Sequence, residues 1–308
     1  MAGESKKTVL VAVGANATIA VVKGIAGIAS GSSALLAEAA HSLADTTNQL
    51  LLLVSIGLGE RPPDEEHPFG HGKERFFWTL LAAVMIFLAG AVFSIGEGVL
   101  NLLRGGGETS FSLAIATIAF AFLAEGASFA RASRQVLAEA REAGVPVAKF
   151  IRQSKDPTVK AVVSEDATDL VGLLLAAAGV TLAHVTGSKA WDAAAAILVG
   201  VLLVVVAVQL GRDTKGLLIG EAAPAAEREL LREAICRHDE VARVLELLTM
   251  YVGPHALLVA VRVDLVDDVP AERIERLSDE IERDLREALA AVRHVFVDAT
   301  PGRTSARV

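Results

Sequence analysis

The second apolar segment of the chain reads Ser33-Ala-Leu-Leu-Ala-Glu-Ala-Ala-His-Ser-Leu-Ala-Asp-Thr-Thr-Asn-Gln-Leu-Leu-Leu-Leu-Val-Ser-Ile-Gly-Leu58. As a helix it is long enough to cross the hydrocarbon core of a bilayer, which takes about 20 residues. His41 and Asp45 nevertheless lie within it. Ionisable groups at membrane depth are costly unless they pair, face water or bind an ion, so these two residues indicate a functional site.

Apolar stretches of similar length occur six times in the first two thirds of the chain. Hydrophobic residues make up 53% of the sequence and the mean hydropathy is +0.49, whereas soluble domains typically have about 45 to 50% apolar residues. Residues 1–212 are therefore predicted to form an all-α bundle of six transmembrane helices embedded in a lipid bilayer. The spans are expected at 8–29, 33–58, 77–103, 110–131, 159–185 and 190–212.

The last third of the chain has a different composition, because charged residues become frequent and no apolar run is long enough to span a membrane. After a linker at 213–221, residues 222–308 are predicted to form a cytoplasmic α+β domain of the ferredoxin-like kind. The expected order is helix, strand, strand, helix and strand, at 225–237, 241–250, 257–265, 271–290 and 294–298. The single cysteine, Cys236, is expected to be a small buried apolar residue.

The charges of the chain indicate which partners are excluded and how the chain is oriented in the membrane. The net charge of -8 argues against nucleic acid as a partner, because phosphate binding needs a basic surface. Lysine and arginine gather in two connections between spans, 60–75 and 132–156. Basic loops stay in the cytoplasm, so both termini are expected to be cytoplasmic.

A second polar motif, Glu165-Asp-Ala-Thr-Asp169, lies in the fifth span. Helix positions four apart share a face, so His41 can act with Asp45, and Glu165 with Asp169. If the second and fifth helices are neighbours, one nitrogen and three carboxylates can close a tetrahedron around a divalent ion. The alternative is a buried polar network that joins the helices.

Three further polar residues in the spans have more than one interpretation. Asn48 lies close to the stripe of His41 and is a candidate accessory ligand. Asp166 points about 100° away from the neighbouring glutamate, and it could be a ligand, a proton relay or the partner of a cation. Glu125 could line a cytoplasmic vestibule or pair with Lys23, and the ion pair is favoured because an unpaired ammonium in an apolar segment is expensive.

Two motifs together carry a family resemblance. The run Gly31-Ser-Ser-Ala-Leu-Leu-Ala-Glu-Ala-Ala-His-Ser-Leu-Ala-Asp-Thr-Thr-Asn-Gln49, followed by His67-Pro-Phe-Gly-His-Gly-Lys-Glu-Arg75, resembles the cation diffusion facilitators, the zinc-transporter-like efflux proteins. The resemblance covers nearly the whole chain. It implies a homodimer in the bacterial inner membrane, whose subunits each bind one metal ion between the second and fifth helices and exchange cytosolic divalent metal for protons.

The resemblance assigns the transport-site ligands to His41, Asp45, Glu165 and Asp169. Many zinc exporters of this family have histidine in the fifth helix, where this chain has Glu165. The resulting site is harder and more anionic, so it admits Mn²⁺, Fe²⁺ or Co²⁺, while His41 keeps Zn²⁺ as the first choice.

The resemblance also points to two sites outside the spans. Asp64, His67 and His71 match a secondary metal site, and their spacing of three and four residues suits zinc; the alternative is a bent surface loop with solvated histidines. In the soluble domain, Arg262 and Asp298 stand where metal-binding histidines are expected. A binuclear site there is doubtful, and dimerisation is the domain's expected role.

The expected mechanism is proton antiport. A buried histidine and three carboxylates repel one another when ionised and empty, so the empty site should hold protons that metal binding releases. An intramembrane hydrolase would need a His-Glu-x-x-His pair or a nucleophile with a base, and the sequence has neither, so the chain is predicted not to be an enzyme. A proton-coupled exporter of organic cations is the alternative from another class, but it leaves the paired ligands and the histidine loop unexplained.

Overall fold

A computed structural model describes residues 2–104, 110–142, 144–147 and 157–299, without the side chains of 2–12, 15, 132, 135 and 157–166. The chain forms two compact units. The first comprises Met1–Gly57 with Phe77–Lys215, and the second comprises Leu58–Phe76 with Gly216–Val308. The loop that contains the histidine motif therefore belongs to the same unit as the C-terminal domain.

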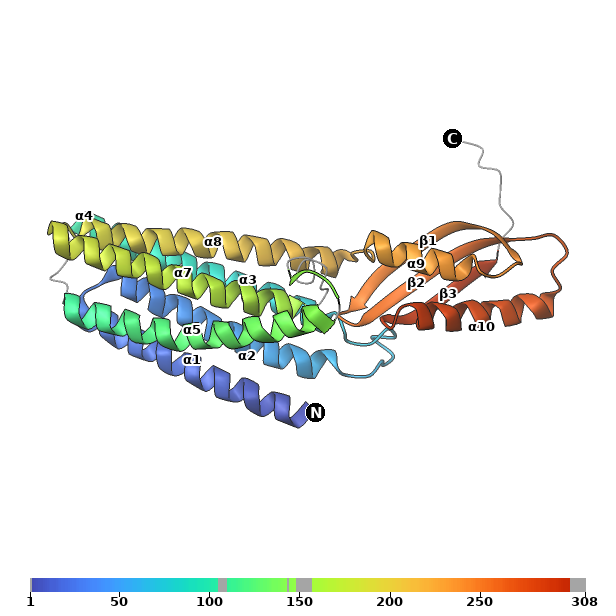
Figure 1. Cartoon of the computed structure of the whole chain (residues 1–308), viewed down its shortest axis with the longest axis horizontal. Coiled ribbons are helices and arrows are strands. Elements are labelled where there is room, and N and C mark those ends of the chain that lie inside the picture. Colours follow the sequence, from blue (N-terminus) through green and yellow to red (C-terminus); the bar gives the residue numbers. More distant parts are fainter. Residues whose placement is uncertain (1, 105–109, 143, 148–156, 300–308) are drawn as a thin grey trace, which may run out of the picture. The chain divides into compact units, whose positions relative to one another are not determined.

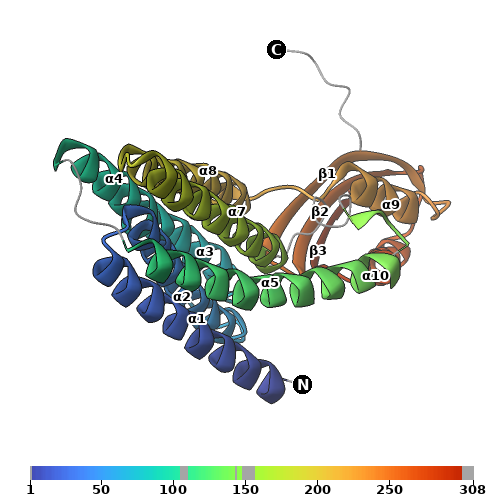
Figure 2. The same ribbon diagram turned by 60° about the vertical axis from the view of Figure 1, so that its left-hand side comes forward.

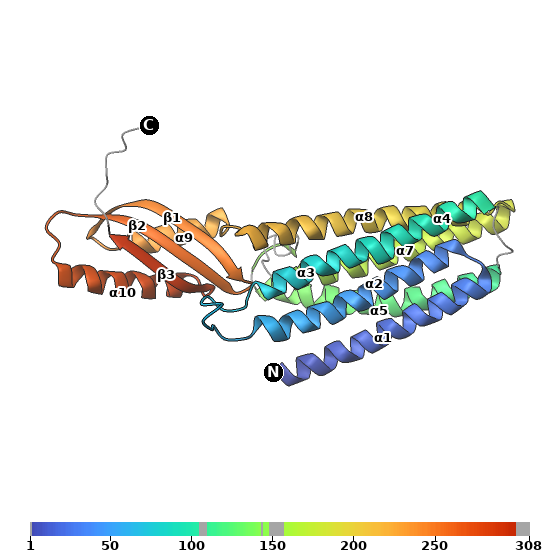
Figure 3. The same ribbon diagram turned by 180° about the vertical axis from the view of Figure 1, so that it is seen from behind.

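The first unit is a bundle of long helices that run side by side (Figures 1 and 3). Each of the six predicted spans coincides to within one residue with part of a helix or, for the third, with a continuous run of helical segments. The elements are α1 (Ala2–Ser30), α2 (Ser33–Gly59), α3 (Glu74–Met85), η1 (Ile86–Val92), α4 (Phe93–Arg104), α5 (Phe111–Glu142), α7 (Pro157–Thr186) and α8 (Ala190–Ile219).

Four helical segments among the described residues are long and apolar enough to cross a membrane: Glu74–Arg104, Phe111–Glu142, Ala167–Thr186 and Ala190–Ile219. Helix α1 contributes a shorter apolar stretch, Asn16–Ser30. Helix α2 has 27 residues, but its polar residues Asp45, Asn48 and Gln49 lower its mean hydropathy.

Small residues bring the third span close to α8. A Cβ atom added at Gly90 would lie 2.9 Å from Leu203, and one added at Gly200 would lie 2.6 Å from Ile95. Such glycines let helix backbones approach in a lipid environment, where association depends on close packing. The third span is also wound as a π-helix in its middle, over η1.

The second unit is a three-stranded sheet covered by two helices (Figure 2). Its elements follow the predicted order: α9 (Ala225–Ile235), β1 (Val241–Gly253), β2 (Ala256–Leu265), α10 (Ala271–Ala288) and β3 (Val292–Ala299). The strand order is β1-β2-β3, with β1 and β2 antiparallel and β2 and β3 parallel. Within the described ranges this sheet has one strand fewer than the four of a ferredoxin-like β-α-β-β-α-β sandwich.

The core of this unit lies between the sheet and the helices. Alternate β2 residues, among them Leu257 and Val259, pack there with Leu277, Ile281 and Leu285 of α10. This spacing follows from the period of two in a strand and of three to four in a helix. Cys236 caps the C-terminal end of α9 and is exposed, so its predicted burial is wrong. A helix end commonly lies at the surface, because its last carbonyl groups need water or capping partners.

The loop from Leu58 to Phe76 packs into the second unit. Phe76 is fully buried in the core that includes α9, β2 and α10. Gly72 lies against the end of β1, where an added Cβ would be only 2.6 Å from the carbonyl oxygen of Val252. The ring of Phe69 makes an edge contact with His294 on β3 at a centroid distance of 5.2 Å. The histidine motif is therefore anchored on the C-terminal sheet.

Candidate metal centre

Three of the predicted transport-site ligands meet between α2 and α7. The Nε2 atom of His41 lies 3.5 Å from Asp45 Oδ2 and 3.2 Å from Asp169 Oδ1. One ligand atom from each residue lies within 4.8 Å of the other two. All three residues are buried. A histidine nitrogen and two carboxylates at this separation have the chemistry and the proximity that a divalent metal ion requires.

The helix geometry explains how these residues come together. His41 and Asp45 are four positions apart on the buried face of α2, so their side chains lie one above the other. Asp169 belongs to α7, and its contact with His41 shows that the second and fifth spans are neighbours. Asn48, the candidate accessory ligand, is fully buried on α2. Glu165 and Asp166 lie on α7, but their side chains fall outside the described residues.

A second cluster of buried charges lies in the same unit. The Lys23 ammonium is 2.7 Å from Glu125 Oε1 and 3.1 Å from Glu38 Oε2, and it donates a hydrogen bond to Ser42. The predicted pair of Lys23 with Glu125 is therefore confirmed. Glu38 was missed by the sequence analysis, although a carboxylate three residues before His41 in an apolar helix is itself a signal of a buried interaction.

The first turns of α2 are fixed by another buried carboxylate, Asp192 of α8. Its two oxygens accept hydrogen bonds from the Ser32 hydroxyl and from the backbone N–H of Ser33, each at 2.6 Å. The N–H groups at a helix start have no partner within the helix, and a carboxylate satisfies them well. This contact joins the beginning of α2 to the beginning of α8 and helps to position the helix that holds His41.

Asp64, His67 and His71 also lie together, in the loop of the second unit. Asp64 Oδ1 is 3.3 Å from His67 Nδ1, and Asp64 Oδ2 is 3.2 Å from His71 Nε2. The backbone N–H of His67 also donates to Asp64, and this bond holds the pKa of that carboxyl below its usual range. Asp64 and His67 are exposed whereas His71 is mostly covered. Water can therefore reach Asp64 and His67, whereas His71 is largely shielded from it.

In the C-terminal sheet, Arg262 and Asp298 pair with each other. Arg262 on β2 lies 3.0 Å from Asp298 on β3 and 3.8 Å from Glu246 on β1. The guanidinium therefore already supplies a cation to the carboxylates of both neighbouring strands.

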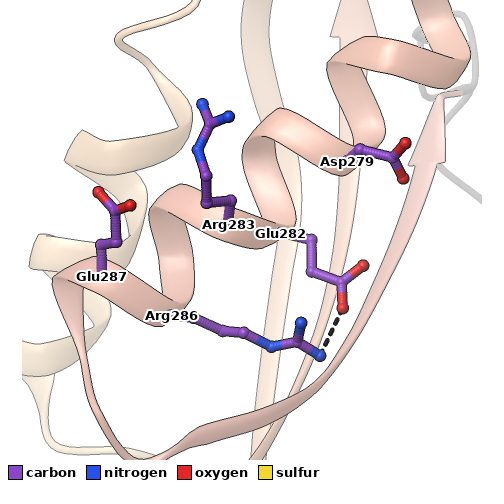
Figure 4. A pocket seen from close by; sticks show the side chains of 5 residues that line it. All are labelled: Asp279, Glu282, Arg283, Arg286 and Glu287. Atoms are coloured by element: carbon purple, nitrogen blue, oxygen red, sulfur yellow. Dashed lines mark ion pairs between the residues drawn. The ribbon is translucent and has the colours of Figure 1, made fainter.

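A shallow hollow on the surface of α10 is lined by charged side chains (Figure 4). The figure shows the side chains along one helix, with Arg286 paired to Glu282. Mixed charges that alternate along an exposed helix form a solvated surface. The hollow is lined by Asp279, Glu282, Arg283, Arg286 and Glu287.

Comparisons with known proteins find similarity to cation transport proteins. A family model described as the cation efflux transmembrane domain matches residues 9–219. The chain is 34% identical over 235 residues to metal tolerance protein C4 of Arabidopsis thaliana, which covers 76% of this chain and 51% of that protein. It is 31% identical over 229 residues to the human mitochondrial proton-coupled zinc antiporter SLC30A9, covering 74% of this chain and 40% of that protein.

Other relatives match the chain along different portions. It is 24% identical over 306 residues to the manganese efflux system protein MneP of Bacillus subtilis, with 96% of each chain covered. The chain thus spans about half of the first relative, 40% of the second and nearly all of the third. A solved MamM C-terminal domain aligns with 25% of this chain and 93% of its own length, at 18% identity and a TM-score of 0.24.

Proposed function

Since the chain belongs to the cation efflux family, the cation diffusion facilitators, we propose that it is a secondary transporter that moves divalent metal ions out of the cytosol. Members of this family are transporters and not enzymes. The observation that carries the proposal is the buried cluster of His41, Asp45 and Asp169 between two membrane helices. Glu165, one helical turn before Asp169, would complete a set of four ligands.

Zinc is the proposed first substrate and manganese the second. An imidazole ligand suits Zn²⁺, and carboxylates suit Mn²⁺, Fe²⁺ and Co²⁺ as well. The relatives are divided in the same way, because one is named as a zinc antiporter and another as a manganese efflux protein. His41 favours zinc, and the two or three carboxylates beside it explain why the alternative metals stay open.

Protons are the proposed counter-ion. Metal ligands have to be deprotonated, so loading the site from the cytosol releases protons, and protons from the other side can displace the metal. Alternating access would move the loaded site between the two faces of the membrane by rocking helices against one another. The proposal includes six membrane crossings in a cell membrane, with both termini in the cytoplasm.

The proposed assembly is a homodimer that the C-terminal domain holds together. One face of its sheet is covered by α9 and α10, whereas Leu248 and Phe296 on the other face are 55% and 54% exposed. The ring of Phe69 covers part of this face, at a centroid distance of 6.4 Å from Phe296. Apolar side chains that stay exposed together on a sheet face commonly mark an interface. Sedimentation of the purified chain with and without Phe296→Glu measures whether this face joins two subunits.

Proton release from proteoliposomes tests the transporter. Zinc added to vesicles that contain the wild-type chain is expected to release protons, and competition with Mn²⁺, Fe²⁺ and Co²⁺ gives the order of preference. Glu165→His should shift that preference toward zinc by about tenfold, because imidazole is the softer ligand. Absence of metal-dependent proton flux overturns the transporter, and an unchanged preference overturns the assignment of Glu165.

We propose that the loop cluster of Asp64, His67 and His71 binds metal ions on the cytoplasmic side of the membrane. Replacing His71 by alanine is expected to remove about one bound zinc ion per chain, because a three-ligand site loses its most buried member. Equilibrium dialysis of the purified chain measures this stoichiometry. His255→Ala, in the exposed turn between β1 and β2, is the matched control and should leave it unchanged. Equal stoichiometry in both variants would contradict the loop site.

A further inference from the structure

A small cavity adjoins the transport cluster on the side of α1 and α5. Its free volume of about 10 Å³ accommodates one water-sized occupant. Apart from one isoleucine the lining offers oxygen-bearing side chains, and His41 does not contribute to it. The lining residues are Asn16, Ile19, Ser42, Asp45, Glu125 and Asp169.

Glu125 presents a carboxylate oxygen that lacks a partner among the described residues. Its Oε1 atom binds the Lys23 ammonium at 2.7 Å, whereas Oε2 is buried and accepts no hydrogen bond there. The residue is only 9% exposed. A buried charged oxygen without a partner is costly, and a bound cation would remove that cost.

The charge balance of this cluster also leaves Glu125 available. A single ammonium, that of Lys23, serves both Glu38 and Glu125, so one negative charge remains. Glu38 is held outside the cavity, with its Oε1 in the space that a side chain at Gly172 would occupy. Of these two carboxylates, Glu125 is the one that lines the cavity.

We propose that Glu125 completes a second, all-oxygen cation position with Asp45 and Asp169, beside the histidine-containing position, and that it thereby determines which metals are transported. The inference rests on the proposed transport function. Oxygen ligands suit Mn²⁺, whereas an imidazole suits Zn²⁺. A chain with both positions can carry an ion that prefers oxygen ligands at the all-oxygen position and a zinc ion at the histidine-containing position. The carboxylates of Asp45 and Asp169 belong to both positions.

Metal uptake by proteoliposomes tests this role, with Glu125→Gln and Glu38→Gln as matched variants of the full chain. Each variant removes one carboxylate partner of Lys23 and keeps the side-chain size, but only the first alters the cavity lining. Glu125→Gln is expected to raise the half-saturating Mn²⁺ concentration about tenfold more than that of Zn²⁺, which is the loss of one charged ligand. Glu38→Gln should change both metals by the same factor.

Glu125→Asp provides a second variant that keeps the negative charge opposite Lys23. It shortens the reach of the carboxylate, so it should still weaken Mn²⁺ uptake relative to Zn²⁺. The second cation position is overturned if the ratio of the half-saturating Mn²⁺ and Zn²⁺ concentrations is unchanged in both Glu125 variants, or if Glu38→Gln shifts that ratio equally. Neither result contradicts the proposed transport function. A wild-type chain that moves neither metal overturns the transporter itself.

Discussion

Replacing His41 by alanine is expected to lower zinc transport by at least about 100-fold, equivalent to about 2.8 kcal/mol. His41 supplies the single nitrogen of the described cluster, and its Nε2 atom lies between Asp45 and Asp169. Its removal takes away the ligand that favours zinc and leaves two buried carboxylates next to each other. Zinc flux into proteoliposomes measures the loss, and Asp45→Ala should produce one of similar size.

His184→Ala is the matched control for this prediction. His184 also lies in a membrane helix, near the end of α7, where it stacks on Phe111 at a centroid distance of 4.2 Å. Its removal takes away a histidine without touching the cluster, so transport should stay within about threefold of wild type, or about 0.7 kcal/mol. Comparable losses in His41→Ala and His184→Ala would mean that the His41 effect comes from damaged helix packing.

The second large effect is expected at Lys23. Replacing it by methionine should lower the free energy of unfolding by about 3 to 5 kcal/mol, because the change leaves buried carboxylates without their cation. Lys23 is fully buried and contacts both Glu38 and Glu125. Denaturation of the detergent-solubilised chain, followed by circular dichroism, measures the change.

A compensating variant separates lost charge pairing from lost packing. Lys23→Met combined with Glu38→Gln and Glu125→Gln has no buried charge left in this cluster, so it should recover most of the lost stability. The triple variant would remain as unstable as the single one if the lysine stem mattered chiefly through its packing. That result would contradict the electrostatic explanation.

The sequence was sufficient to locate the helices and half of the site. Length and apolarity indicate the spans, and a spacing of four residues puts His41 and Asp45 on one helical face. The pairing of Lys23 with Glu125 was also predictable, because an ammonium in an apolar segment needs a carboxylate. Each of these inferences depends on local pattern or on charge alone.

Other features depend on how distant elements pack. Whether Asp169 reaches His41 depends on α2 and α7 being neighbours, which no local pattern determines. Glu38 escaped notice because its contact with Lys23 depends on how α1 and α2 are rotated against each other. The packing of Phe69 and Gly72 on the C-terminal sheet was likewise missed, since a loop contains no periodic pattern that identifies its partner.

The burial of Phe76 also bears on how the chain folds. Its neighbours in the core come from Leu217 onward, so more than a hundred residues of membrane helices are synthesised before they exist. Contacts of such long sequence separation form slowly, because a large loop has to close first. The contacts that bury Phe76 can therefore form only after the core residues of the C-terminal domain have been synthesised.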